Sequence, residues 1–211
     1  MIAMLLAAAV AIAPAEVLAR YVTALAGTRT PAVLTFEYTL DQTGTRNGEQ
    51  RHRVFRSGND ERDELLVADG HKVTPPSVRI FHNRPNRYTL ERLAPRPGAY
   101  AFRFVGEHHS GRGTAYVFAA LARAPGAFRV TSVTIDGATF LPTAIAFETA
   151  HEGRGTVTFA IFDRYWMPSD VNVRATYGNQ PMTEHIGFAQ YRFPAALPAG
   201  TFAVPRVSEA D

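Results

Sequence analysis

The stretch Gly155-Thr-Val-Thr-Phe-Ala-Ile-Phe-Asp-Arg-Tyr-Trp-Met-Pro168 shows most clearly how this chain is built. From Val157 to Ile161 every second residue is large and apolar, which is typical of a strand with one buried face. Asp163-Arg164 interrupts the run, and the alternation resumes at Val171. Two alternating runs around a short polar break predict a β-hairpin.

The same alternation precedes this hairpin. Apolar residues recur from Phe128 to Ile135, Asp136-Gly137 follows, and a further apolar run includes Ile145. Asp-Gly between two alternating runs is a strong hairpin signal. The segment Ala138 to Pro142 predicts a connection wider than two residues. Successive hairpins of this kind indicate a meander of antiparallel strands.

Length and composition limit the classes of protein that this chain can belong to. Its 211 residues suit one all-β domain, and the 46% hydrophobic and 19% charged content argues against extensive disorder. The net charge of +3 comes from scattered arginines, with Lys72 as the sole lysine, so we expect no nucleic-acid partner. With no cysteine, the chain has no disulfide, Cys-ligated zinc, thiol nucleophile or lipidated cysteine.

The N-terminus favours export. Residues Met1 to Ala15 are apolar and too short for a membrane span, and Ala13-Pro14-Ala15 offers small residues for cleavage before Glu16. We therefore predict a signal peptide over 1–15 and a single domain over 16–211. No Lys or Arg precedes Arg20, which is atypical of a signal, so a buried N-terminal helix stays as the alternative.

One helix and a series of strands are expected along the mature chain. Apolar residues at helical spacing predict a helix from Glu16 to Gly27. Pro75-Pro76 predicts a break over Val73 to Pro76, because proline donates no ladder hydrogen bond. The other expected strands are Val33–Leu40, Glu49–Arg56, Leu65–Val67, Val78–Phe81, Arg87–Leu93, Tyr100–Val105, Thr114–Leu121 and Glu184–Phe193.

Two charged runs allow a functional and a structural interpretation. Arg51, His52, Arg53 and Arg56 are either a basic patch at the mouth of a site or the solvated face of a half-exposed strand, and we favour the solvated face. The acidic run Asp60-Glu-Arg-Asp-Glu64 lacks the ligand spacing and glycine of a calcium loop, so we expect a solvated turn.

Candidates for chemistry are few. His108-His109 could bind a metal only from a loop, where we expect the pair to lie, and no matching second cluster is present. Ser110 next to His109 makes no catalytic triad, and glycine-rich nucleotide-binding motifs are absent. Trp166, the sole tryptophan, either stacks on a ligand or caps the core. We predict no catalytic residue, no metal and no cofactor.

Several short motifs occur in an order that resembles the LolA-type lipoprotein-carrier superfamily, which includes LolA, LolB and the N-terminal domain of RseB-type regulators. After the N-terminal helix these motifs are Phe36-Glu-Tyr-Thr39, Leu66-Val-Ala-Asp-Gly70, Val133-Thr-Ile-Asp136 with Leu141-Pro142, Tyr165-Trp-Met-Pro168, and Phe188-Ala-Gln-Tyr-Arg-Phe-Pro194 before Leu197-Pro198 and Thr201-Phe202. The resemblance covers nearly the whole mature chain.

The resemblance implies an all-β fold with minor α: an unclosed, strongly curved half-barrel covered by the N-terminal helix, with an apolar cavity for acyl chains. The expected function is that of a periplasmic, non-catalytic carrier or chaperone, with lipid or an acylated lipoprotein as partner, transient membrane association and a monomeric state. The expected lipid-binding residues are Leu34, Phe36, Tyr38, Leu40, Phe102, Phe104, Tyr116, Phe118, Val157, Phe159 and Ile161.

Two other functions remain open. A module of the same fold could bind an envelope protein during stress signalling or assembly, in which case it would hold no lipid. An enzyme acting on glycan or cell-wall material could use Trp166 and the histidines at 108 and 109. A register error of one residue would exchange the two faces of every expected strand.

Overall fold

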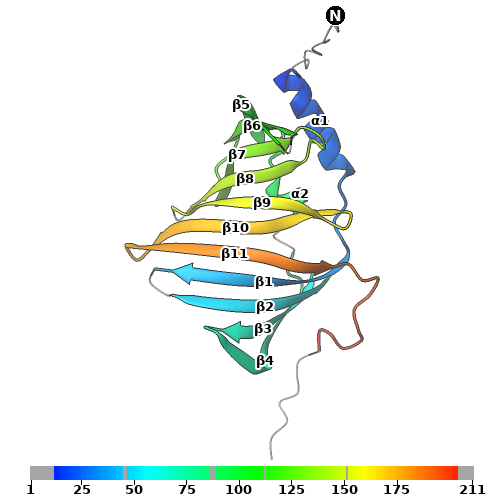
Figure 1. Ribbon diagram of the computed structural model, residues 1–211, viewed down its shortest axis with the longest axis vertical. Coiled ribbons are helices and arrows are strands. Elements are labelled where there is room, and N and C mark those ends of the chain that lie inside the picture. The colour runs from blue at the N-terminus through cyan, green and yellow to red at the C-terminus, as the bar shows by residue number, and fades with distance from the viewer. Residues whose placement is uncertain (1–11, 45–46, 86–88, 112, 151, 204–211) are drawn as a thin grey trace, which may run out of the picture.

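The computed structural model describes residues 12–44, 47–85, 89–111, 113–150 and 152–203. These residues form an eleven-stranded antiparallel sheet in the order β4-β3-β2-β1-β11-β10-β9-β8-β7-β6-β5. The sheet curves around one face and its edge strands, β4 and β5, stay apart (Figure 1). The predicted half-barrel with minor helix is therefore confirmed.

Short connections join successive strands along the chain, apart from one long connection between β4 and β5. They are β1 Val33–Thr43, β2 Gly48–Ser57, β3 Asp60–Ala68, β4 His71–Phe81, β5 Tyr100–Ser110, β6 Gly113–Ala122, β7 Phe128–Asp136, β8 Pro142–Thr149, β9 Arg154–Phe162, β10 Tyr165–Tyr177 and β11 Gln180–Arg192. β1 and β11 pair, so the two ends of the folded chain meet in the middle of the sheet.

The apolar alternation seen in the sequence becomes one continuous row on the concave face. Ile145 lies directly opposite Val157, and Val157 opposite Val171. Directly opposed residues of neighbouring strands point to the same face, so the row can be followed from strand to strand. It consists of Phe104, Phe118, Val133, Ile145, Val157, Val171, Ile186 and Leu40.

Helix α1, Pro14–Gly27, covers the β5 end of this concave face (Figure 1). Proline at the first helical position and Glu16 in the first turn favour helix initiation there. Tyr21 is fully buried, packs edge-on against Phe102 and donates a hydrogen bond to the Pro95 carbonyl oxygen at 2.8 Å. The helix therefore turns the β5 to β9 part of the concave face into a core.

The connection between the two edge strands includes α2, Leu90–Leu93, which lies against β10. Leu90 and Leu93 are buried, so this short helix adds to the core. The predicted strand over Arg87–Leu93 is therefore wrong from Thr89 onward, and its first two residues lie outside the described residues. Four residues are too few to distinguish the two periodicities, and tertiary contact decided the outcome.

Two further expectations are corrected. β4 continues through Pro75-Pro76, although its ladder to β3 is irregular there, because an edge strand tolerates missing donors on its free side. His108 and His109 lie within β5 rather than in a loop. His109 contacts Thr114 and Glu107, and the described residues contain no group of three potential metal ligands.

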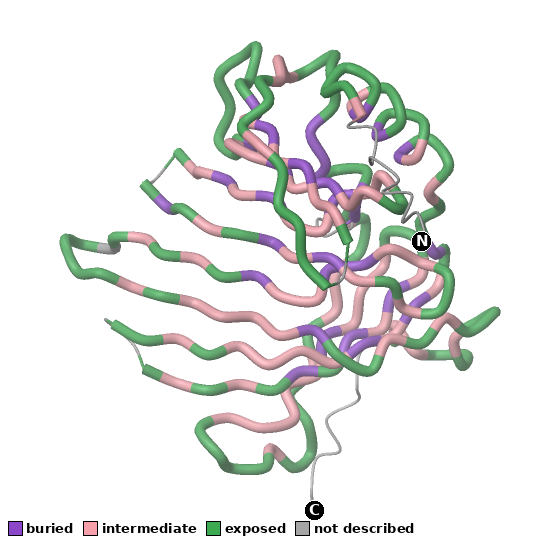
Figure 2. The backbone as a smooth tube through the Cα atoms, turned by 45° about the horizontal axis from the view of Figure 1, so that its top comes forward, coloured by how far each residue is buried: buried purple, intermediate pink, exposed green. Residues whose placement is uncertain are grey.

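Buried positions concentrate toward one end of the strands, while the hairpin tips at the other end are exposed (Figure 2). Met1 to Ala11 of the predicted signal peptide lie outside the described residues. Pro14 and Ala15, which cleavage before Glu16 would remove, are the first two residues of α1. Neither described helix is long and apolar enough to cross a membrane.

Candidate functional site

The concave face has an uncovered half, between β11 and β4, that forms a cavity of about 270 Å³. One wall is apolar and comes mainly from β1 and β11. It consists of Phe36, Tyr38, Leu40, Val54, Phe81, Ile186 and Phe188. The other wall is polar and comes mainly from β2, β3, β4 and the segment after β4. It consists of Arg56, Glu61, Asp63, Arg79, Arg84 and Glu184.

The apolar wall is held by ring contacts between β1 and β11. The ring centroids of Phe36 and Phe188 lie 5.8 Å apart, and those of Phe36 and Tyr191 lie 5.3 Å apart. Tyr38 and Phe188 are direct cross-strand partners. Leu40 and Ile186, the next pair along these strands, are only partly buried, so the wall opens toward the hairpin tips.

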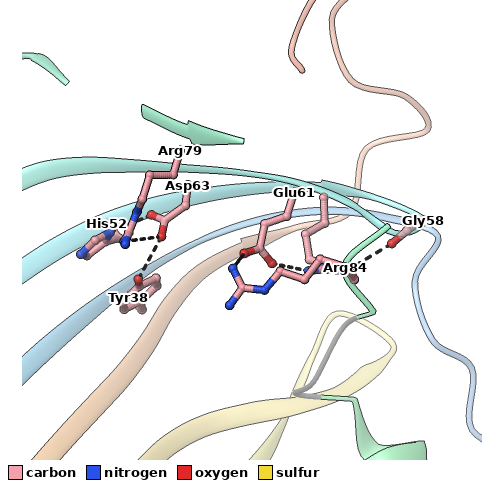
Figure 3. A network of polar contacts seen from close by, with 8 residues as sticks. Tyr38, His52, Gly58, Glu61, Asp63, Arg79 and Arg84 are labelled. Carbon is pink, nitrogen blue, oxygen red and sulfur yellow. Dashed lines mark hydrogen bonds and ion pairs between the residues drawn. The ribbon is translucent and has the colours of Figure 1, made fainter. Parts of the chain in front are cut away.

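The polar wall contains a network around Asp63, which we call the Asp63 cluster (Figure 3). The Asp63 carboxylate lies 2.7 Å from His52 Nδ1 and accepts hydrogen bonds from Arg79 Nη2 at 3.1 Å and the Tyr38 hydroxyl at 3.4 Å. His52 and Asp63 are 2% and 6% exposed. The His52 ring, the Arg79 guanidinium and the Tyr38 hydroxyl thus compensate for the removal of the Asp63 carboxylate from water.

A second network, the Glu61 cluster, lies beside the first (Figure 3). Glu61 pairs with Arg56 and accepts a hydrogen bond from Arg84 Nη1 at 2.9 Å. Arg56, only 3% exposed, also donates from Nη2 to the Arg84 carbonyl oxygen at 2.7 Å. Arg84 in turn lies 4.2 Å from the centre of the Phe81 ring. The cluster therefore attaches the segment after β4 to the floor of the cavity.

These clusters correct two expectations. The basic run on β2 is not simply a solvated face, because His52 and Arg56 point inward and are buried, while Arg51 and Arg53 are exposed. The acidic run is not a solvated turn, because it lies in β3 and places Asp63 against the cavity. Cross-strand pairing makes this possible, because β2 places His52 and Arg56 beside the β3 carboxylates.

The expected lipid-binding residues are divided by the fold. Phe36, Tyr38 and Leu40 line the cavity, whereas Phe104 is 38% exposed on the edge strand and Ile161 is 62% exposed in a separate recess. The others belong to the core or pack against it. These are Leu34, Phe102, Tyr116, Phe118, Val157 and Phe159. Lipid binding itself stays a prediction for the three residues in the cavity.

Sequence reasoning missed most of the cavity. Ile186 and Phe188 lie in the expected strand Glu184–Phe193, but only the β1–β11 pairing places them beside Tyr38 and Leu40. Val54 stands next to Phe55 in a strand that is otherwise polar or glycine, so β2 shows no apolar alternation. The charged members gave no signal, because a local pattern cannot distinguish a buried ion pair from a solvated one.

No family model matches the sequence, and a search of curated proteins finds no match. Among solved structures, the chain is similar to a LolA superfamily protein from Nitrosomonas europaea, with 12% identity and a TM-score of 0.49 over 92% of this chain and 99% of that one. A putative outer membrane lipoprotein-sorting protein domain from Vibrio parahaemolyticus has 14% identity and a TM-score of 0.48 over 88% and 95% of the two chains.

MucB is also similar, with 15% identity and a TM-score of 0.35 over 90% of this chain and 63% of MucB. The Nitrosomonas protein carries the name of the superfamily that the sequence motifs resemble. At 12% to 15% identity and TM-scores of 0.35 to 0.49, this likeness supports no conclusion about what the chain binds. What this chain binds has to follow from its own cavity.

Proposed function

We propose that this protein binds an acyl chain of a lipid or acylated lipoprotein in the concave cavity and carries it through the periplasm without catalysing a reaction. The observation that carries the proposal is the uncovered apolar wall. Leu40 and Ile186 belong to the cross-strand row of apolar residues on the concave face. The helices α1 and α2 help to cover the part of this row nearer β5, but the described helices leave Leu40 and Ile186 facing the cavity.

The size of the cavity suits one acyl chain better than several acyl chains. About 270 Å³ lies just below the range of ordinary ligand pockets, which begins near 300 Å³. Burying ten methylenes would stabilise the complex by about 8 kcal/mol before association costs of several kcal/mol. The expected affinity is therefore modest, as a carrier that must release its cargo requires.

The polar wall supports an amphiphilic cargo. Arg79 and Arg84 are partly exposed at the cavity, with 62% and 36% of their side chains accessible. Each already pairs with one carboxylate, Asp63 or Glu61. Because a guanidinium carries five donors, both retain donors for a phosphate or ester group. The acyl chain would then lie along Phe188 and Leu40.

Native mass spectrometry with organic extraction tests the proposal on protein purified from a bacterial periplasm. We expect bound phospholipid or acylated peptide, and we expect Leu40→Asp and Ile186→Asp to remove it while leaving the fold intact. Leu121→Asp is the matched control, because Leu121 is 57% exposed and does not line the cavity. A purified protein that contains no lipid and takes up no fluorescent fatty acid would contradict the carrier hypothesis and favour a protein-interaction module.

A further inference from the structure

A second recess, of about 410 Å³, lies between the end of α1 and the β9–β10 hairpin. Its lining shares no residue with the lipid cavity. Its lining consists of Ala24, Gly27, Thr28, Arg29, Thr139, Leu141, Ile161, Arg164, Tyr165 and Trp166. We call it the hairpin recess.

The floor of the hairpin recess is apolar and open to solvent. Ile161 is 62% exposed, the largest exposed fraction among the large hydrophobic residues that the structure describes. It lies directly opposite Trp166 across the hairpin, and Leu141 completes the floor. An exposed aliphatic side chain next to a partly exposed indole, inside a concave recess, is typical of a binding surface rather than of ordinary surface.

Three uncharged polar side chains of the recess already donate hydrogen bonds within the protein. Trp166 Nε1 donates to the Pro142 carbonyl oxygen at 2.7 Å, and Thr28 Oγ1 donates to the Leu25 carbonyl oxygen at 2.8 Å. Thr139 Oγ1 donates to the Asp136 carboxylate at 2.7 Å. These three donors are therefore not available to the hydroxyl groups of a sugar, which argues against a glycan as occupant.

The two charged side chains of the recess are both arginines, Arg29 and Arg164, and among the described residues no carboxylate lines it. The Arg164 guanidinium lies 5.2 Å from the centre of the Tyr165 ring. A hydrogen bond to the Tyr165 hydroxyl also raises the pKa of Arg164, so the group stays cationic. An apolar floor between two guanidinium groups is complementary to an apolar side chain flanked by carboxylates.

We propose that the hairpin recess binds a short acidic segment of a partner protein, with one bulky apolar side chain of that segment against Ile161 and Trp166 and its carboxylates on Arg29 and Arg164. A peptide fits better than a bilayer surface, because Leu141 and Trp166 lie in a concavity. A flat membrane would instead require apolar side chains that protrude. The partner surface is thus separate from the lipid cavity.

A random peptide library displayed on phage tests this inference with the full chain as bait. We expect enrichment of peptides that combine Asp or Glu with a large apolar residue. Because Trp166 is the sole tryptophan and lies in the recess, binding of a selected synthetic peptide should change the intrinsic fluorescence. Ile161→Asp should weaken that binding at least tenfold, and added salt should weaken it further.

Matched variants separate this surface from the proposed carrier function. Leu121→Asp, which places the same charge at an exposed site outside the recess, should bind peptide normally, and so should the cavity variant Leu40→Asp. Arg29→Glu with Arg164→Glu should prefer a peptide whose acids are replaced by lysine. No enrichment over the Ile161→Asp bait would overturn the inference. Enrichment of basic peptides would also overturn it. So would the finding that anionic phosphatidylglycerol vesicles, and not peptides, bind to the protein in a way that depends on Ile161.

Discussion

The imidazole of His52 lies flat against the ring of Tyr38, with centroids 4.6 Å apart and planes 4° apart. The two residues are directly opposite each other on β1 and β2, and both reach the Asp63 carboxylate on β3. Three neighbouring strands are therefore joined by one side-chain network on the concave face. This network forms the border between the apolar wall of the cavity and its charged wall.

Asp63→Asn should reduce the free energy of unfolding by about 2–4 kcal/mol, because it leaves the buried His52 without its charged acceptor and removes the ion pair with Arg79. Urea unfolding followed by circular dichroism measures the loss. Asp170→Asn is the control, because that carboxylate is about half exposed and contacts His185 at 3.3 Å on a solvated surface. Equal losses for both variants would contradict the assigned role of Asp63.

Arg56 and Arg53 provide a matched pair within β2. Arg56→Ala should cost about 3–5 kcal/mol, because it leaves the mostly buried Glu61 carboxylate with fewer partners and releases the Arg84 carbonyl oxygen. Arg53→Ala should cost less than about 1 kcal/mol, because the Arg53–Glu37 pair is at the surface. Chemical denaturation should reveal this difference at both low and high salt. A cost for Arg56→Ala as small as that expected for Arg53→Ala would contradict the burial of the Arg56–Glu61 pair.

Tyr21 should make the protein less stable at alkaline pH. Burial raises the pKa of its hydroxyl above the ordinary value of 10.0. Above that pH the unfolded chain loses the proton while the folded chain keeps it, so the free energy of unfolding falls by about 1.4 kcal/mol per pH unit. The contribution is complete below pH 10 and is lost as pH rises through the pKa of the folded state.

Tyr21→Phe tests this by removing the titrating group. At neutral pH it should cost about 1 kcal/mol, because the hydrogen bond to Pro95 is lost. Urea unfolding measured from about pH 8 to pH 11 should show a smaller alkaline loss in the variant. Tyr191, whose pKa is also raised by burial, should retain part of the slope. An unchanged slope would mean that Tyr21 does not titrate as described.

Gly155 marks a close approach between the centre of the sheet and a ring. A Cβ at this position would lie 2.5 Å from Cζ of Phe147 and closer still to the Asn172 carbonyl oxygen. Gly155→Ala should therefore destabilise the protein by about 1–3 kcal/mol in thermal or urea unfolding. Gly106→Ala, where no atom lies within 4 Å, should be neutral or slightly stabilising. A larger loss of stability for Gly106→Ala than for Gly155→Ala would contradict the close contact of the Phe147 ring with β9.

Phe159→Asp should disrupt folding and not selectively remove cargo, although Phe159 was expected to contact lipid. Its side chain is 6% exposed and belongs to the core, so a charge there should lower soluble yield and thermal stability. Leu40→Asp, in the partly exposed wall, should fold and lose cargo. Normal folding of Phe159→Asp with selective loss of lipid would place the binding site under α1 instead.

The sequence by itself determined the local structure. Alternation around Asp163-Arg164 and Asp136-Gly137 was sufficient to predict hairpins, because strand periodicity and turn chemistry are properties of a few consecutive residues. The helix ending at Gly27 followed from its periodicity for the same reason. Where a segment was short, as at Leu90–Leu93, the local signal failed because a few residues fit either period.

Only the tertiary structure decided which apolar residues are covered and which charged residues are buried. Phe118 and Leu40 belong to the same cross-strand row, yet Phe118 lies in the core beneath the helical layer and Leu40 faces the cavity. Asp63 and His52 look like surface residues in sequence, and their burial became possible only when β2 and β3 paired. Burial of charge depends on partners that the fold brings together, and so does the location of the candidate site.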